Sequence, residues 1–251
     1  MAEKELLKAR FIELARRAEM GGYFTFTDFL GLAEQSTFEE IKHKLGRTAY
    51  KTFGGAVGAE RVMIRFGSKE ELGYDATFPI ACILVRPRSQ KFADRLTHRD
   101  FLGALMSLGI EREVLGDIAI FDNCGYVFVK EALCDFISSS LTEVKRTDVV
   151  CERCEEIPEG KLYRTEPRRI QLSSERLDAV IAKSFSLSRE DAQLLFSRGL
   201  VFVNGRLIES PSHTPRNEDK ISVRGHGRLI YRGADGLTRK GKLNVTIEMY
   251  V

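Results

Sequence analysis

Residues 188–208 read SREDAQLLFSRGLVFVNGRLI, and this stretch contains local signals for a helix, a stop and a hairpin. Ser188 can cap a helix, with an aspartate three residues further on, and Gly199 is a typical helix terminator. The valine-rich run that follows is strand-like, and Asn204-Gly205 is a strong hairpin-turn dipeptide. We therefore expect a helix followed by a short antiparallel hairpin.

A second helix is expected just before this stretch. Apolar residues recur at helical spacing from Leu177 to Phe185, and Ser173 or Ser174 can cap that helix. Further strands are expected over residues 220–223, 228–231 and 243–248, the last two forming a hairpin. We place this C-terminal module at residues 174–251. The stretch 155–173 holds two prolines and many charges, which predicts a linker or an edge segment.

The middle of the chain, residues 76–154, has the predicted element order βαββαβ. Strands are expected over residues 78–86, 117–121, 125–130 and 144–150, and helices over residues 97–109 and 131–141. This order is the ferredoxin-like arrangement that RNA-recognition domains (RRM-like) also use.

The first 75 residues predict a small α+β module. An amphipathic helix is expected over residues 2–20, and Thr27 or Asp28 can cap a second helix that ends near Leu45. Strand-like runs follow at 49–53 and 61–66, joined by the glycine-rich loop 54–58. The fold class expected for the whole chain is therefore α+β.

Composition narrows the class of partner. Among 251 residues, 39 Lys and Arg stand against 36 Asp and Glu, a net charge of +3, and from residue 174 onward there are 13 basic and 9 acidic residues. The excess positive charge lies in the C-terminal third, where a polyanion partner is expected. The longest charge-free apolar runs are about half the length that crosses a bilayer. Five cysteines without an export signal indicate a reduced, cytoplasmic protein with no membrane partner.

The C-terminal module resembles an S4 (αL) RNA-binding domain. The resemblance rests on Arg176-Leu177-Asp178, Ser188-Arg189, Ala192, Gly199, Val201–Gly205, and Asp219 with Ile221–Arg224. The rest of the chain is similar to bacterial YlmH-type S4 proteins, through Phe26–Leu30, Gly54-Gly55, Ala59–Arg61, His98–Ile110 and Gly116–Ile118. That resemblance implies a non-enzymatic RNA-binding protein linked to the large ribosomal subunit, rRNA and possible tRNA contacts, and quality control of stalled translation. Genes of that family often sit near cell-division genes.

The S4 resemblance agrees with the placement of basic and polar side chains. Arg189 and Gln193 are expected at the start of a helix whose first amides can meet a phosphate. The candidate RNA-binding residues are Arg176, Ser188, Arg189, Gln193, Arg198, Asn204, Arg206, Lys220 and Arg224. Five more cations, Arg228, Arg232, Arg239, Lys240 and Lys242, extend this basic surface into the final hairpin. We expect Asp178 to be a structural acceptor and not a catalyst.

Secondary RNA contacts are expected from the middle domain. His98 and Arg99 open its first helix, where exposed amides attract anions. Tyr126 and Phe128 alternate onto one strand face in a partial match to the aromatic motif of RNA-recognition domains, and either base stacking or core packing fits them. The pair Cys151 and Cys154 is half of a zinc ribbon without a second half, so no metal or other cofactor is expected.

Two other functions stay open. S4 modules are commonly fused to pseudouridine synthases, and Arg176-Leu177-Asp178 superficially resembles the Arg-Leu-Asp of their active sites, which would make the chain an RNA-modifying enzyme. Here the tripeptide is used by the start of the predicted helix, and we find no other catalytic motif. A scaffold role in cell division is the third interpretation. The sequence does not determine the oligomeric state.

Overall fold

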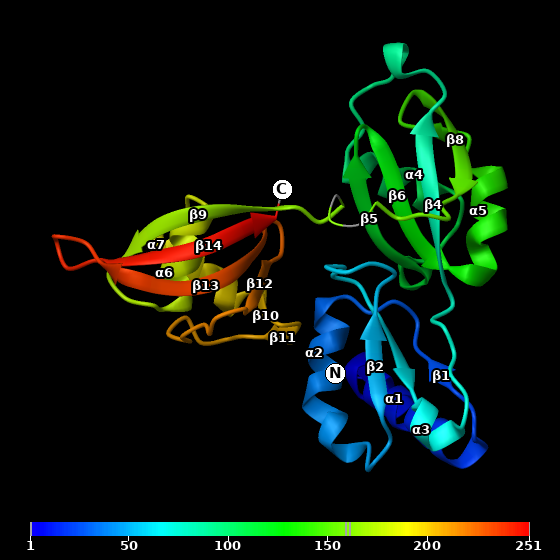
Figure 1. Cartoon of the computed structure of the whole chain (residues 1–251), viewed down its shortest axis with the longest axis horizontal. Coiled ribbons are helices and arrows are strands. Elements are labelled where there is room, and N and C mark those ends of the chain that lie inside the picture. The colour runs from blue at the N-terminus through cyan, green and yellow to red at the C-terminus, as the bar shows by residue number, and fades with distance from the viewer. Residues whose placement is uncertain (1, 159, 161, 251) are drawn as a thin grey trace. The chain divides into compact units, whose positions relative to one another are not determined.

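The computed structural model describes residues 2–158, 160 and 162–250, and it is a mixed α+β structure with three antiparallel sheets (Figure 1). The chain divides into two compact units, Met1–Tyr163 and Arg164–Val251. Each unit has its own core. No helix in the described part of the chain combines the length and the apolar character needed to cross a bilayer.

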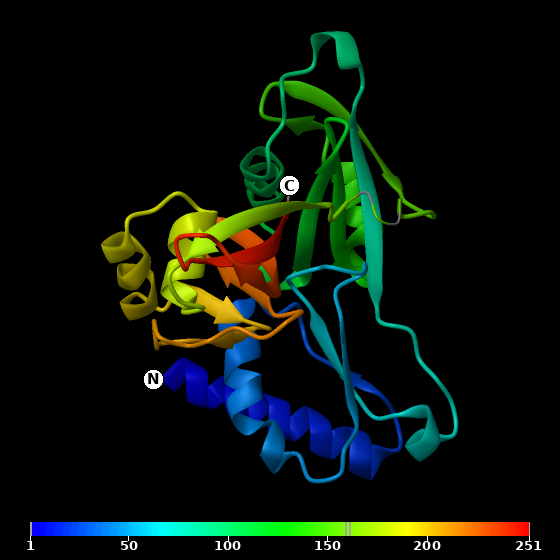
Figure 2. The same cartoon turned by 60° about the vertical axis from the view of Figure 1, so that its left-hand side comes forward.

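The first part of the first unit is a three-stranded sheet with two main helices. Its elements are α1 (Ala2–Gly21), β1 (Thr25–Phe26), α2 (Leu32–Ile41), η1 (Lys42–Lys44), β2 (Tyr50–Phe53), β3 (Met63–Phe66) and α3 (Lys69–Leu72). The strand order is β1-β3-β2. Helix α1 lies beside α2 (Figure 2), and their apolar faces enclose Phe11, Phe38 and Phe66. The predicted α+β module is therefore present.

The second helix begins later than the sequence predicts. Gly31, and not Thr27 or Asp28, is its N-cap residue. The Thr27 hydroxyl instead accepts a hydrogen bond from the Ile64 amide at 2.9 Å and donates to the Asp28 carbonyl at 2.7 Å. A polar side chain that extends strand pairing in this way is not free to cap a helix.

The second part of the first unit has the predicted βαββαβ order. Its elements are β4 (Ile80–Pro87), η2 (Gln90–Phe92), α4 (His98–Ser107), η3 (Arg112–Val114), β5 (Leu115–Phe121), β6 (Cys124–Lys130), η4 (Glu131–Leu133), α5 (Cys134–Ser140), β7 (Glu143–Val144) and β8 (Thr147–Arg153). The sheet order β5-β6-β4-β8-β7 is antiparallel throughout and ferredoxin-like in its first four strands. The last predicted strand is split in two, because Lys145 adopts a positive φ of 60° and turns the chain.

The two faces of this sheet are both covered. Helices α4 and α5 pack on the face that carries Ile83, Val85 and Val127. The opposite face carries Cys82 and Phe128, and it packs against Phe29 and Met63 of the first part of the unit. Phe128 is completely buried. In an RNA-recognition domain this second face would be open to bases.

The glycine-rich loop 54–58 explains how the backbone can approach Phe128 so closely. Gly55 has a φ of +96°, and a Cβ atom added there would lie 2.3 Å from the Phe128 ring. The neighbouring Asp117 carboxylate accepts hydrogen bonds from the amides of Glu60 (2.7 Å) and Arg61 (2.9 Å). The loop is therefore a packing element that joins the two parts of the first unit.

Replacing Gly55 by alanine should destabilise the first unit by roughly 3 kcal/mol, because backbone strain and overpacking against Phe128 add together. Gly46 is the matched control: its φ is +66° and nothing lies within 4 Å of an added Cβ atom. Gly46→Ala should cost only about 1 kcal/mol. Hydrogen exchange of β4 and β6 amides measures the difference, and equal losses for the two variants would contradict the role of Phe128.

The second unit is a six-stranded antiparallel sheet with two helices on one face. Its elements are β9 (Thr165–Leu172), α6 (Leu177–Ser184), α7 (Arg189–Ser197), β10 (Val201–Val203), β11 (Arg206–Leu207), β12 (Lys220–Val223), β13 (Gly227–Leu237) and β14 (Leu243–Tyr250). The strand order is β11-β10-β12-β13-β14-β9. The core lies between the helices and the sheet and contains Val180, Phe196, Val201, Ile221 and Ile247. The helix, stop and hairpin expected from residues 188–208 are all present.

The expected linker 155–173 contains a strand of this sheet. Strand β9 pairs with β14 over its full length, from Thr165 opposite Tyr250 to Leu172 opposite Leu243, and forms the sheet edge. Pro167 is compatible with an edge position, since such a strand has one side without sheet partners. The edge-segment alternative therefore describes residues 165–172, and the second compact unit starts at Arg164 instead of 174.

Helix α6 also begins differently from the prediction. Its N-cap residue is Arg176, with no side-chain cap, and neither Ser173 nor Ser174 has that role. The first two amides of the helix, Leu177 and Asp178, donate instead to backbone carbonyls of the loop before β12, those of His213 (2.8 Å) and Pro211 (3.1 Å). The distant loop replaces the serine cap.

Candidate nucleic-acid interface

The start of α6 and the start of α7 are joined by one buried carboxylate. Asp178 is completely buried, and its two oxygens accept hydrogen bonds from three side chains. Arg176 donates from Nε (3.2 Å) and Nη2 (3.1 Å), Arg189 from Nη2 (2.9 Å), and Gln193 from Nε2 (3.1 Å). Three of the predicted RNA-binding residues are thereby brought together, and Asp178 is the structural acceptor that we expected.

The arginines of this cluster remain accessible although their acceptor does not. Side chains of Arg176 and Arg189 are 41% and 44% exposed. A guanidinium group has five N–H donors, and Asp178 receives hydrogen bonds from only some of them. Two cations face one carboxylate, so one positive charge is left over. The arrangement presents fixed, partly exposed guanidinium groups, which suit a phosphate.

Asp178 stays ionised over the whole physiological range. Burial alone would raise the pKa of its carboxyl group, but the hydrogen bonds from Arg176, Gln193 and Arg189 outweigh burial and lower the pKa to about 2. The same contact raises the pKa of Arg176. The cluster, which we call the Asp178 cluster (Arg176, Asp178, Arg189 and Gln193), therefore keeps its charges fixed.

The first turn of α7 is less suited to a phosphate than the sequence suggests. Ser188 caps the helix by accepting a hydrogen bond from the Asp191 amide at 3.0 Å, and its hydroxyl donates to the Asp191 carboxylate at 2.6 Å. Glu190 adds a second negative charge in the same turn. Because carboxylates already occupy the region that the helix dipole favours for anions, the guanidinium groups are the better phosphate ligands.

The remaining candidates in the second unit do not lie on one face. Arg198 ends α7 and is exposed. Arg206 is paired with Val203, a core residue, so Arg206 lies on the helix side of the sheet edge. Lys220 lies opposite Ile230 on the other face, and the Arg224 guanidinium lies 5.3 Å from the centre of the Phe202 ring. The predicted surface is thus divided between two faces of the unit.

Asn204 is used inside the unit. It has a φ of 50°, as its turn position requires, and its side chain donates to Asp219 (2.8 Å) and accepts from the Lys220 amide (2.9 Å). Both functions of the amide group are therefore satisfied by the hairpin and the start of β12.

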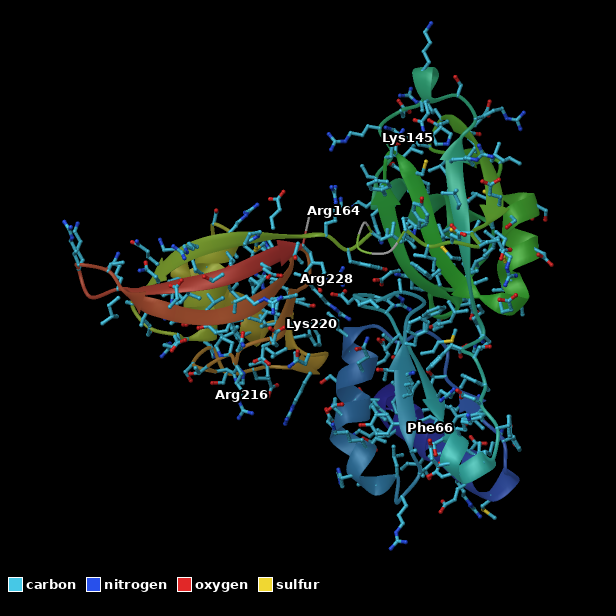
Figure 3. The ribbon with its side chains drawn as sticks, in the orientation of Figure 1. Phe66, Lys145, Arg164, Arg216, Lys220 and Arg228 are labelled. Carbon is cyan, nitrogen blue, oxygen red and sulfur yellow. The ribbon has the colours of Figure 1, made fainter. Side chains whose placement is uncertain are left out.

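Only some of the five cations that extend the basic surface into the final hairpin remain available to contact a phosphate. Arg232 is bound by two carboxylates, Glu248 at 2.9 Å and Glu218, which neutralise it. Arg228 packs its guanidinium 4.4 Å from the centre of the Tyr250 ring. Arg228 and Lys220 lie on neighbouring strands of the sheet (Figure 3). The cations Arg239, Lys240 and Lys242 lie at the exposed tip between β13 and β14.

The candidate secondary contacts of the middle domain separate into two pairs. Thr97 and Asp100 form the predicted cap of α4, in which the Thr97 amide donates to the Asp100 carboxylate at 2.8 Å. His98 and Arg99 follow this cap and are exposed. Partial desolvation and the nearby positive charge of Arg112 lower the pKa of His98, which makes it a weaker cation for a phosphate than the neighbouring Arg99.

Of the aromatic pair in the middle domain, Phe128 is buried instead of open, which corrects the expectation that it contacts RNA. Phe128 lies under the loop at Gly55, so it cannot stack on an RNA base; the core-packing alternative is the right one. Tyr126 is half-buried in the same apolar cluster. No sequence signal within the strand distinguishes these outcomes, because the covering residues belong to a different part of the chain.

The two cysteines of the Cys-x-x-Cys motif point to different cores. Cys151 packs with the helix-covered face, and its thiol donates to the Leu141 carbonyl at 3.2 Å. Cys154 packs on the opposite face and donates to the Glu156 carbonyl at 3.2 Å. Within residues 2–158, 160 and 162–250, no group of three or more His, Cys, Asp or Glu side chains could hold a metal ion.

Sequence reasoning did not reveal how firmly Arg61 is held. Its guanidinium donates to the carbonyls of Phe29 (3.0 Å), Arg112 (3.0 Å) and Leu115 (2.8 Å). Arg112 lies beside it, where burial and the charge of Arg61 lower the pKa of Arg112 to about 10. Arg61 thus joins the two parts of the first unit, whereas the Arg112 guanidinium donates to the Leu115 and Gly116 carbonyls of its own part. The sequence hints at this role of Arg61 only through its position just after the glycine-rich loop 54–58.

The family described as "Putative RNA-binding domain in YlmH" matches residues 75–157, which are the ferredoxin-like part of the first unit. The chain is 35% identical over 165 residues to "Ribosome-associated protein quality control protein P2" of Bacillus subtilis (strain 168). That match covers 63% of this chain and 63% of the relative, so it spans less than two thirds of the relative's length.

Among solved structures, the chain is similar to the "Cell division protein ylmH from Streptococcus pneumoniae". The TM-score is 0.48 and the sequence identity is 21%, over 61% of this chain and 92% of that chain.

Proposed function

Residues 75–157 match the family "Putative RNA-binding domain in YlmH", and the chain is similar to a ribosome-associated quality control protein. From this, we propose that the protein binds structured RNA at the ribosome through its second unit. The bound RNA would be rRNA of the large subunit, with tRNA nearby, and the process would be rescue or quality control of stalled translation. The relative named for ribosome-associated quality control supports this process. Such a role would be carried out in the cytoplasm.

The Asp178 cluster is the observation that carries the proposal. Two half-exposed guanidinium groups and an amide are held by one fully buried carboxylate, at the place where the sequence resembles an S4 domain. Fixing long side chains before binding reduces the conformational entropy that is lost on binding. A cluster of this kind therefore fits recognition of a phosphate backbone better than it fits a general surface charge.

The proposed mechanism is binding without a chemical step. Guanidinium groups neutralise phosphates and set the orientation of the protein, while the shape of a folded RNA provides selectivity. Asp178 cannot easily be a nucleophile in this arrangement, since its oxygens accept four hydrogen bonds from three partners. The proposal accordingly includes no cofactor and no catalytic residue.

Co-sedimentation with large ribosomal subunits, with and without RNase treatment, tests the proposed function. We expect the full chain to travel with intact large subunits and to be released when the RNA is digested. Sedimentation unaffected by RNase would favour a protein scaffold. Absence from the subunit fraction, together with modified nucleosides in free RNA incubated with the chain, would favour an RNA-modifying enzyme and contradict the proposal.

A further inference from the structure

The small sheet of the first unit has an aromatic and cationic face that the motifs above do not use. Residues opposite one another in an antiparallel pair share a face. Arg65 of β3 lies opposite both Phe26 of β1 and Lys51 of β2. Because side chains alternate along a strand, Phe53 shares the face of Lys51. Phe78, just before β4, packs against Phe53 with the ring centres 5.5 Å apart.

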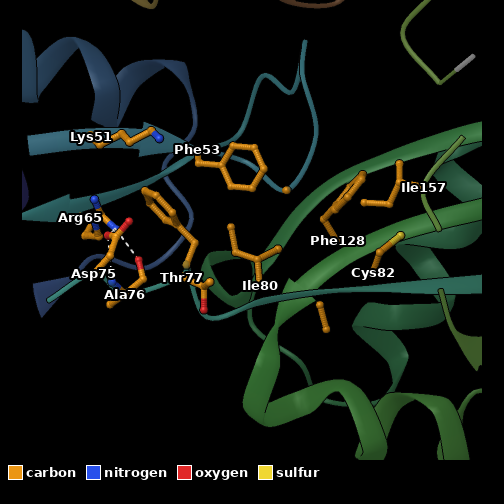
Figure 4. Close-up of a pocket in the computed structure, with 13 residues that line it drawn as sticks. Lys51, Phe53, Arg65, Asp75, Ala76, Thr77, Ile80, Cys82, Phe128 and Ile157 are labelled. Atoms are coloured by element: carbon orange, nitrogen blue, oxygen red, sulfur yellow. Dashed lines mark hydrogen bonds and ion pairs between the residues drawn. The ribbon is translucent and has the colours of Figure 1, made fainter. Parts of the chain in front are cut away.

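A cavity opens beside this face. Its volume is about 430 Å³, which is in the range of small-ligand sites. Lys51, Phe53 and Arg65 line one side, and Ile80 of the ferredoxin-like part lies on the other (Figure 4). Phe78 also lines the cavity. The part of the lining from residue 75 onward falls within the region that matches the RNA-binding family.

Arg65 is an unusual residue for the middle of a sheet. It is only 9% exposed, and its guanidinium carbon lies 4.5 Å from the centre of the Phe24 ring and 5.7 Å from that of Phe78. Its Nη1 atom donates to the Asp75 carboxylate at 2.7 Å and to the Ala76 carbonyl. Its Nε atom is buried and has no hydrogen-bond partner among the described residues. The rings and the cation therefore form a fixed platform.

Lys51 adds a second positive charge next to Arg65, and no carboxylate among the described residues of the cavity neutralises it. It lies directly opposite Arg65, and like charges in that position repel each other unless an anion is present. Asp75 compensates Arg65, but Lys51 forms no ion pair with any residue in the described part of the chain. Two cations and one carboxylate thus give the cavity an excess positive charge, beside a Phe53 ring that is 37% exposed.

We propose that this cavity binds a nucleotide of single-stranded RNA, with the base on Phe53 and the phosphate on Lys51. Aromatic rings beside cations are the usual means of binding single strands without sequence preference, because every base has a π-face and every nucleotide has a phosphate. A purely apolar partner would leave Lys51 without an anion, and a simple anion would not use the exposed ring. This site is separate from the Asp178 cluster and would give the chain a second RNA contact.

Photo-crosslinking of the full chain with a short oligouridylate that contains 4-thiouridine tests the proposal. The background variant carries Arg176→Ala, Arg189→Ala and Arg198→Ala, so that binding at the second unit does not mask the result; the unmodified chain is measured in parallel. We expect the crosslink on the tryptic peptide Thr52–Arg61, which contains Phe53. In the same background, Phe53→Ala should weaken oligouridylate binding about tenfold.

Charge is tested with Lys51→Glu, which should weaken binding at least as much and reduce the salt slope by about 0.7, the value for one contact on a single strand. Phe136→Ala and Lys44→Glu are matched controls, since both residues are exposed elsewhere on the first unit, and both should bind as their parent does. Circular dichroism checks folding. The absence of a crosslink on residues 52–61, or unchanged binding by Phe53→Ala and Lys51→Glu, would overturn the proposal without affecting the role of the second unit.

Discussion

Replacing Arg176, Arg189 and Arg198 together by alanine should weaken binding to large-subunit RNA on the order of 100-fold at low salt. The slope of log affinity against log salt should fall by about 1 for each phosphate contact that is lost. Arg176 and Arg189 should account for most of the effect, because Asp178 holds both of them in place. Arg198 lies at the other end of α7 and should contribute less.

Charge reversal should be more severe than truncation at Arg189. A glutamate there would join Glu190 and Asp191 in the first turn of α7 and repel a phosphate. Binding across a salt series measures these effects, with folding checked by circular dichroism. Lys44→Glu, an exposed change in the first unit, is the control and should leave the slope unchanged. Unaltered affinity and slope in the triple variant would show that this surface does not bind RNA.

Asp178→Asn should lower the stability of the second unit at neutral pH by about 2 kcal/mol. Its folded pKa of about 2 is below the ordinary value of 3.8, so the carboxylate contributes stability that is fully present above about pH 4. That contribution is lost as the pH falls toward 2. The difference between the variant and the natural chain should therefore be largest at pH 7 and should shrink on acidification.

Asp178→Asn also distinguishes two contributions to RNA binding: the fixed position of the Arg176 and Arg189 guanidinium groups, and their positive charge. Both arginines remain, so the salt slope should stay close to that of the natural chain, while affinity should fall roughly tenfold because the guanidinium groups are no longer fixed. Asp235→Asn is the control, as this exposed carboxylate pairs with Arg169 in the same unit. Urea unfolding at pH 7 and pH 3 and RNA titration provide the measurements. A stability difference that does not vary with pH would rule out the role given to Asp178.

Local signals in the sequence account for most of the secondary structure. The Thr97–Asp100 cap, the Ser188 cap and the positive-φ glycines at 109 and 199 lie where the helix boundaries require them. Asn204-Gly205 forms the turn that it predicts. Each of these signals acts over a few residues, so it is the same in any tertiary setting. The βαββαβ order and the helix–hairpin order of the second unit follow from them.

Boundaries were less predictable wherever a distant segment supplies a hydrogen bond. Helix α6 starts at Leu177 because carbonyls at 211 and 213 accept its first amides. Strand β9 is recognisable only through β14, more than seventy residues later. The sequence of each segment carries no signal of its distant partner. A serine before a helix therefore does not fix the helix start, and a charged, proline-containing stretch can be read as a linker or as an edge strand.

The sequence by itself determined the α+β class, the order of most of the elements and the basic character of the C-terminal third, because capping, turn and alternation signals are local and charge is additive. Only the tertiary structure decided which side chains act together. It buried Phe128 under a glycine loop, and it gathered Arg176, Arg189 and Gln193 around Asp178. It also placed Phe53 and Lys51 beside a cavity. These outcomes depend on contacts between segments far apart in the chain, whose free energy is set by packing and desolvation in the folded state and not by any one segment.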